Sequence, residues 1–179
     1  YLSQASGAES TSLAAQSSAT GFGTLALGKE ASASEQYASA IGIGAAASNL
    51  DATAVGAFSQ ATGDESTAFG AGADARAENA TAIGQSAEAS GDRATALGEN
   101  AEASGSGSTA LGQDSEAAFG FSTAIGIGAE TLFTNQFMFG TSSNIYTMPG
   151  ITSNASRQAQ SGPLSLVLTD ANGNLASDG

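Results

Sequence analysis

The sequence has 179 residues, of which 17 are acidic and 4 are basic, and its formal net charge is −13. Nucleic acid and anionic membrane surfaces repel such a chain, so we expect neither as a partner. It contains no His and no Cys, the residues that supply the commonest general base and the strongest nucleophile in enzymes. We therefore expect no catalytic activity, no cofactor and no protein-bound metal.

A four-residue pattern, Thr-Ala-apolar-Gly, recurs with an unbroken 14-residue period and with no insertion or deletion. Full copies begin at Thr53, Thr67, Thr81, Thr95, Thr109 and Thr123, and weaker copies begin at Thr11, Leu25, Ser39 and Phe137. Ten copies at one period decide the fold before any local prediction does. Residues 1–10 match the second half of a unit, so the repeat region is predicted to span 1–140.

Small and apolar positions within a unit are two residues apart, which is the period of a strand. A helix would lose roughly 1 kcal/mol for each glycine in its interior. Each unit is long enough for two strands of about five residues and two tight turns, so stacked units predict an all-β parallel β-solenoid. Ten coils spaced about 4.8 Å apart make a rod roughly 45–50 Å long.

Two columns of residues define the expected packing. The apolar column stands directly before the motif glycine, and we place it inside the coil. The alanine column stands one position earlier, and we interpret it as a subunit interface because small residues let a second backbone approach closely. Alternatively, alanine simply tolerates solvent there. The apolar column is Leu13, Leu27, Ile41, Val55, Phe69, Ile83, Leu97, Leu111, Ile125 and Phe139, and the alanine column runs from Ala26 to Ala124.

Five acidic residues stand four positions after the motif glycine in successive coils, and we call them the acidic ladder. Stacking is predicted to align them on one edge, where neighbours about 4.8 Å apart in water repel by roughly 0.9 kcal/mol per pair. The ladder is a candidate docking stripe for a basic partner or for divalent cations. The alternative is a solvated edge that keeps a β-rod from aggregating. The acidic ladder consists of Asp74, Glu88, Glu102, Glu116 and Glu130.

The threonines that open the six full copies (Thr53 to Thr123) suggest an alternative function, because regular Thr arrays on flat β-solenoids can match an ice lattice. Further along, large apolar residues between Leu132 and Phe139 replace small ones. We predict that they cap the open end of the core.

Residues 141–179 lie beyond the repeat and are predicted to form a separate, β-rich connector. A strand is expected at 164–169, followed by a hairpin turn at 170–173, where Asn-Gly supplies the positive φ angles that tight hairpins need.

The unit at 81–91, T-A-I-G-x-x-A-x-A-x-G, resembles the head repeat of YadA-type trimeric autotransporter adhesins. The resemblance covers residues 1 to about 140. It implies a left-handed parallel β-roll that packs as a homotrimer, carried on a coiled-coil stalk and anchored in the bacterial outer membrane by a C-terminal barrel. Two features depart from the family pattern. Thr replaces the family's Val in six units, and no basic neck motif is found, since 154–160 holds a single Arg.

The resemblance implies a surface-exposed adhesin head that attaches to host matrix, cells or surfaces, or promotes autoaggregation. The alternatives are a non-binding structural spacer of a trimeric surface fibre and, third, an ice-binding β-solenoid. The chain begins with Tyr1 rather than Met, so we expect it to be part of a longer protein whose other parts hold it in the outer membrane. No stretch approaches 18 apolar residues, so we expect no direct membrane contact from this part. Because each coil buries so little bulk, folding is expected to require assembly.

Overall fold

The computed structural model describes residues 2–147, 167–169 and 173–177. Every regular element in this described part is a β-strand, and it holds no helix long and apolar enough to cross a membrane. The chain divides into two compact units, Tyr1–Ser143 and Asn144–Gly179. We describe each unit by itself.

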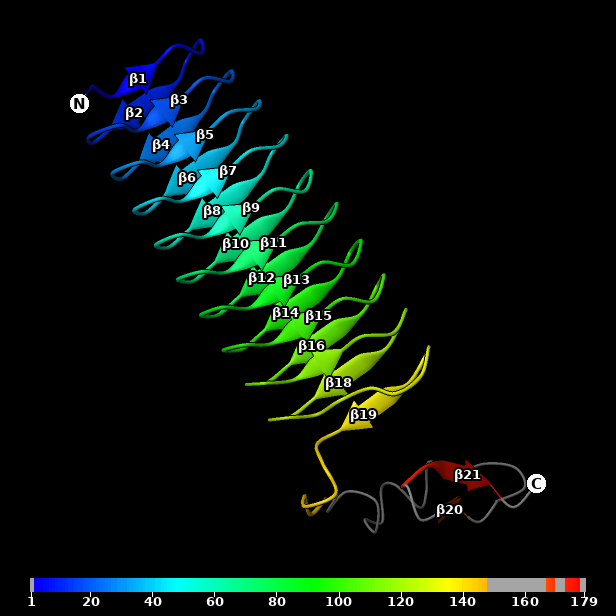
Figure 1. Ribbon diagram of the computed structural model, residues 1–179. Coiled ribbons are helices and arrows are strands. Elements are labelled where there is room, and N and C mark those ends of the chain that lie inside the picture. The colour runs from blue at the N-terminus through cyan, green and yellow to red at the C-terminus, as the bar shows by residue number, and fades with distance from the viewer. Residues whose placement is uncertain (1, 148–166, 170–172, 178–179) are drawn as a thin grey trace, which may run out of the picture. The chain divides into compact units, whose positions relative to one another are not determined.

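The first unit is a parallel β-solenoid in which each coil contributes one strand to each of two sheets, as Figure 1 shows. Sheet A consists of β1 (Gln4–Ala5), β3 (Ser18–Ala19), β5 (Ser32–Ala33), β7 (Ala46–Ala47), β9 (Gln60–Ala61), β11 (Asp74–Ala75), β13 (Glu88–Ala89), β15 (Glu102–Ala103) and β17 (Glu116–Ala117). Sheet B consists of β2 (Thr11–Leu13), β4 (Leu25–Leu27), β6 (Ser39–Ile41), β8 (Thr53–Val55), β10 (Thr67–Phe69), β12 (Thr81–Ile83), β14 (Thr95–Leu97), β16 (Thr109–Leu111), β18 (Thr123–Ile125) and β19 (Phe137–Phe139).

Neighbouring strands pair with the same offset of one repeat unit throughout, so that Thr67 pairs with Thr81 and Asp74 with Glu88. This confirms the predicted all-β parallel solenoid of 14-residue coils. The strands are shorter than the expected length, at two or three residues each, because the chain bends on both sides of them. The backbone ladder nevertheless continues through the bends, where for example the Gly70 N–H donates to the Val55 carbonyl at 2.8 Å.

Two features of the bend require glycine at the motif position: a positive φ angle, and the close approach of the next coil. Gly84 has a φ of +137°, in the region that favours glycine. A Cβ added to Gly84 would lie 2.2 Å from the carbonyl oxygen of Gly98 in the next coil. The coils therefore approach so closely that no side chain fits between them at this bend.

The core between the two sheets is built from small side chains alone. Ala75 and Ala89 from sheet A and Ala82 and Ala96 from sheet B are fully buried. Serines complete the core at the bends, and five of the six buried serine hydroxyls donate to a backbone carbonyl three residues earlier, as Ser66 does to Gly63 at 2.6 Å. The buried hydroxyl of Ser108 has no such partner among the described residues. The core therefore contributes little hydrophobic burial per coil, because a methyl group is the largest apolar group in it.

The structure reverses both packing predictions. The apolar column lies outside the coil, with Ile83 37% and Leu97 41% exposed, whereas the alanine column is fully buried in the interior. Alternation along a strand explains the reversal, since both neighbours of an inward-facing residue must point outward. The interior placement of the apolar column and the interpretation of the alanine column as a subunit interface are therefore both wrong.

The predicted cap is wrong for all but one of its residues. In β19, Met138 takes the inward position of the alanine column and packs against the core. Phe137 and Phe139 point outward, 66% and 53% exposed, with their ring centroids 6.4 Å apart. Leu132 and Phe133 are also at least half exposed. Only the middle residue of a three-residue strand can face the core, so the bulk lies on the surface.

In the second unit, β20 (Val167–Thr169) pairs antiparallel with β21 (Leu175–Ser177). Gly173 precedes β21 with a φ of +79°. The remainder of the predicted strand (164–166), the turn residues 170–172 and the segment 154–160 lie outside the described residues.

Candidate binding surfaces

The outer face of sheet B is a row of large apolar side chains. In each of the six strands β8, β10, β12, β14, β16 and β18, the buried alanine is flanked by two outward residues, a threonine and a member of the apolar column. Several members are widely exposed, including Leu13 at 63% and Phe69 at 54%. Register pairing stacks them coil on coil, as in Phe69↔Ile83 and Ile83↔Leu97. A continuous apolar surface of this kind is typical of sites that bind another protein or a ligand.

The threonine column lies on this same outer face. Thr67, Thr81 and Thr95 pair in register in neighbouring strands, and all three are half-buried. Each shares its strand with a large outward apolar residue, such as Ile83 beside Thr81. The face thus mixes apolar groups with half-buried hydroxyls. It is not the flat array of exposed hydroxyls that the ice-binding alternative requires.

The acidic ladder lies on the outer face of sheet A, rather than on an edge of the coil. Asp74, Glu88, Glu102 and Glu116 are register partners in β11, β13, β15 and β17, and an isolated bridge pairs Glu116 with Glu130. All five predicted residues therefore stand in one row, about 4.8 Å apart along the rod. Within the described residues no group of three acidic, His or Cys side chains converges as a metal site. The ladder spreads its carboxylates along a line.

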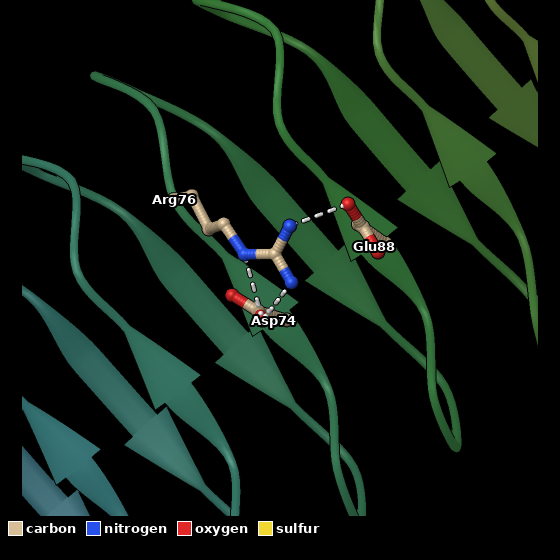
Figure 2. A network of polar contacts seen from close by, with 3 residues as sticks. All are labelled: Asp74, Arg76 and Glu88. Carbon is tan, nitrogen blue, oxygen red and sulfur yellow. Dashed lines mark hydrogen bonds and ion pairs between the residues drawn. The ribbon is translucent and has the colours of Figure 1, made fainter.

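Arg76 pairs with the first two members of the ladder, and sequence reasoning missed it. Figure 2 shows its guanidinium between Asp74 and Glu88, with nitrogen–oxygen distances of 2.7 Å to a carboxylate oxygen of each. The hydrogen bond to Asp74, followed by the charges of Asp74 and Glu88, raises the pKa of Arg76. In the neighbouring coils the same position carries Thr62 and Ser90. A single Arg among hydroxyl residues at this position was therefore the feature of the sequence that could have indicated the pairing.

Glu102 has no such cation beside it. Partial burial raises the pKa of its carboxyl, and the charges of Glu116 and Glu88 raise it further. The described residues show no ion pair for Glu102, Glu116 or Glu130. Arg76 thus offsets one of the two acidic charges at the start of the ladder, and no described cation pairs with the ladder from Glu102 onward.

Known proteins share this repeat geometry. A profile described as the YadA head domain repeat matches residues 19–45, 47–73, 75–101 and 103–129, which together make more than half of the chain. A crystal structure described as the collagen-binding domain of the Yersinia adhesin YadA aligns with a TM-score of 0.66 and 32% sequence identity. That alignment covers 72% of this chain and 72% of the other. No curated protein sequence matches the chain significantly.

Proposed function

Because the chain belongs to the YadA head-repeat family, we propose that it forms the trimeric head of a bacterial surface adhesin. The head is displayed at the cell surface and held in the outer membrane by parts of the protein outside this sequence. The family and the fold are those of an adhesin rather than of an enzyme family. The proposed role is attachment to extracellular matrix.

The exposed apolar face of sheet B is the observation that carries the proposal. Fully burying one Leu, Ile or Phe side chain is worth about 1.5–3 kcal/mol, and the partly exposed members of the column would each gain a fraction of this. Packing three copies around a common axis covers all three rows at once and leaves no open face for further growth. The alanine core offers no comparable burial, so the stability of the chain depends on assembly.

The ligand we propose is collagen-like matrix, because the similar Yersinia structure is described as a collagen-binding domain. A rod of repeated coils suits such a ligand, since many weak contacts add up through avidity. The acidic ladder remains a candidate ligand surface beyond the reach of Arg76. The second candidate function is a spacer, favoured by the small, polar side chains that cover much of sheet A.

The test is the mass of the purified chain by light scattering, followed by binding of the same sample to immobilised collagen. We expect a mass three times the 17.3 kDa of one chain, and saturable binding. A stably folded monomer would contradict the trimer. A trimer that binds no collagen would favour the spacer.

A further inference from the structure

Three large apolar side chains form a patch on one edge of the rod, and we call Phe22, Tyr37 and Leu50 the edge patch. They lie in the turns that lead from sheet A to sheet B in three successive coils, after β3, β5 and β7. Their exposed fractions are 40%, 50% and 40%. They belong neither to the alanine core nor to the apolar face of sheet B.

The edge patch is held rigidly by the backbone ladder. The Tyr37 N–H donates to the Phe22 carbonyl at 2.9 Å, and the Glu65 N–H of a later coil donates to the Leu50 carbonyl at 2.8 Å. The rings of Phe22 and Tyr37 meet edge to face, with centroids 5.6 Å apart. The patch is therefore preorganised, which lowers the entropy cost of binding a partner.

The turn that carries Tyr37 accommodates an aromatic residue but does not require one. Tyr37 has a φ of 59°, a left-handed conformation that bulky residues rarely adopt, and other coils place Asp51, Asn79 or Phe121 at the same position. The Tyr37 ring fits because the residue at the same position of the preceding coil is Gly23. A Cβ on Gly23 would lie 2.9 Å from a ring carbon of Tyr37. Phe58 and Phe121 are accommodated over a glycine in the same way, so the ring alone does not indicate a partner. What distinguishes Tyr37 is its contact with Phe22 beside Leu50, which makes a patch of three exposed apolar side chains that a partner can cover.

Negative charge surrounds the edge patch. Between β1 and β10, five exposed carboxylates occupy the turns of this edge, and these turns hold no Lys or Arg. A complementary partner therefore combines apolar groups with positive charge. The five acidic residues are Glu9, Glu35, Asp51, Asp64 and Glu65.

The spacing of the patch points to the backbone conformation of that partner. Phe22 and Leu50 hold the same turn position two coils apart, a separation of about 9.6 Å along the rod. A polyproline II chain has three residues per turn and a rise of about 3.1 Å, so its side chains recur on one face about every 9.3 Å. A polyproline II chain lying along the rod would present one side chain to every second coil. Proline-rich segments in this conformation dock on aromatic surfaces.

We propose that the edge patch binds a proline-rich, lysine- or arginine-bearing chain in the polyproline II conformation, as found in each strand of a collagen triple helix. This inference rests on the proposed matrix-binding function and names the surface that carries it. Phe22 and Tyr37 supply the aromatic contacts, Leu50 extends them, and the surrounding carboxylates attract the basic side chains.

The experiment measures binding of the trimer to a synthetic triple-helical Gly-Pro-Pro peptide that carries lysine at intervals. The variant is Phe22→Ser with Tyr37→Asn, since Ser106 and Asn79 occupy these turn positions in other coils. We expect the double variant to remain a trimer and its dissociation constant to rise tenfold or more, as for other aromatic hot spots. Replacing lysine in the peptide by glutamate should weaken binding to the unaltered protein.

Phe58→Ser is the matched control. Phe58 also has a left-handed turn conformation, lies against the glycine of the preceding coil and is 64% exposed, but it occupies the opposite edge. Its substitution should leave binding unchanged. If the double variant forms a trimer and binds the peptide as tightly as the unaltered protein does, the inference is overturned but the collagen proposal still stands. The same holds if Phe58→Ser loses as much binding as the double variant does. Loss of the trimer in the double variant would also overturn it, by making the edge a subunit contact. An unaltered trimer that binds no peptide and no collagen would refute both.

Discussion

Sheet A and sheet B share one alanine core, yet their outer faces differ completely. The outer row of sheet A carries small, amide or acidic residues such as Ser18, Gln60 and Glu102, while the outer row of sheet B carries Thr and large apolar residues such as Leu97. A coil this thin has no room for bulky side chains. Its large apolar residues therefore lie outside the core, and of the two sheet faces only that of sheet B carries them. This contrast is why we propose the face of sheet B as the trimer contact.

The sharpest test of this contrast places charge on the apolar face. We expect Ile83→Glu with Leu97→Glu to abolish the trimer and to lower the free energy of unfolding by about 3 kcal/mol or more, because each interface would bury unpaired carboxylates. Light scattering and chemical denaturation of the same sample would measure both effects.

The matched control is Gln60→Glu, which adds an exposed charge to the outer face of sheet A beside Asp74. It should leave the mass unchanged and alter stability by less than about 1 kcal/mol. If the charged sheet B variant still formed trimers, the apolar face would not be the interface.

A smaller effect is expected where the acidic ladder meets its cation. Arg76→Ser removes the pairs with Asp74 and Glu88, and serine is the residue of the neighbouring coil at Ser90. The Arg76 side chain is half-exposed, so we expect a loss of about 0.5–1 kcal/mol that shrinks in high salt. Thermal denaturation at two salt concentrations would measure it. Arg93→Ser, where the described residues show no ion pair, should cost less; an equal loss would contradict a role for the pairing.

The smallest effect concerns Glu102 and pH. Because its pKa is raised in the folded chain, the folded state binds the proton more tightly than the unfolded state does. Protonation of Glu102 therefore increases the free energy of unfolding as the pH falls from neutral through the raised pKa. The increase reaches its full size below the ordinary pKa of glutamate. Glu102→Gln should flatten that growth and change stability at pH 7 by less than about 0.5 kcal/mol. A pH profile identical to that of the unaltered protein would refute this.

The sequence was sufficient for the architecture and the family but not for the packing direction. An unbroken 14-residue period predicts stacked parallel coils whatever the side chains do, and the register of Thr67 with Thr81 follows from it. Period alone does not say which of two alternating positions faces inward. We placed Leu and Ile inside by hydrophobicity, but the sheet separation admits only residues such as Ala82.

The surfaces were predicted unevenly for the same reason. The acidic ladder is one residue type at one position in successive coils, so stacking alone aligns it. Arg76 departs from a column of mostly small residues, and the column of Tyr37 has no common residue type. Their importance depends on what lies in the adjacent coil, Glu88 for the one and Gly23 for the other, and only the folded chain brings those neighbours together.

The uninterrupted 14-residue register also means that the length of the solenoid can change only by whole coils. Every interior coil offers the same hydrogen-bonding edge to the coils before and after it, so gene duplication or deletion of one whole unit leaves both junctions intact. Each such event changes the reach of the rod by one strand spacing, about 4.8 Å. A change of any other length would shift the glycines and alanines out of their columns. Natural variation in length should therefore occur in whole repeat units, so the length of the solenoid can evolve in small steps that leave its structure unchanged.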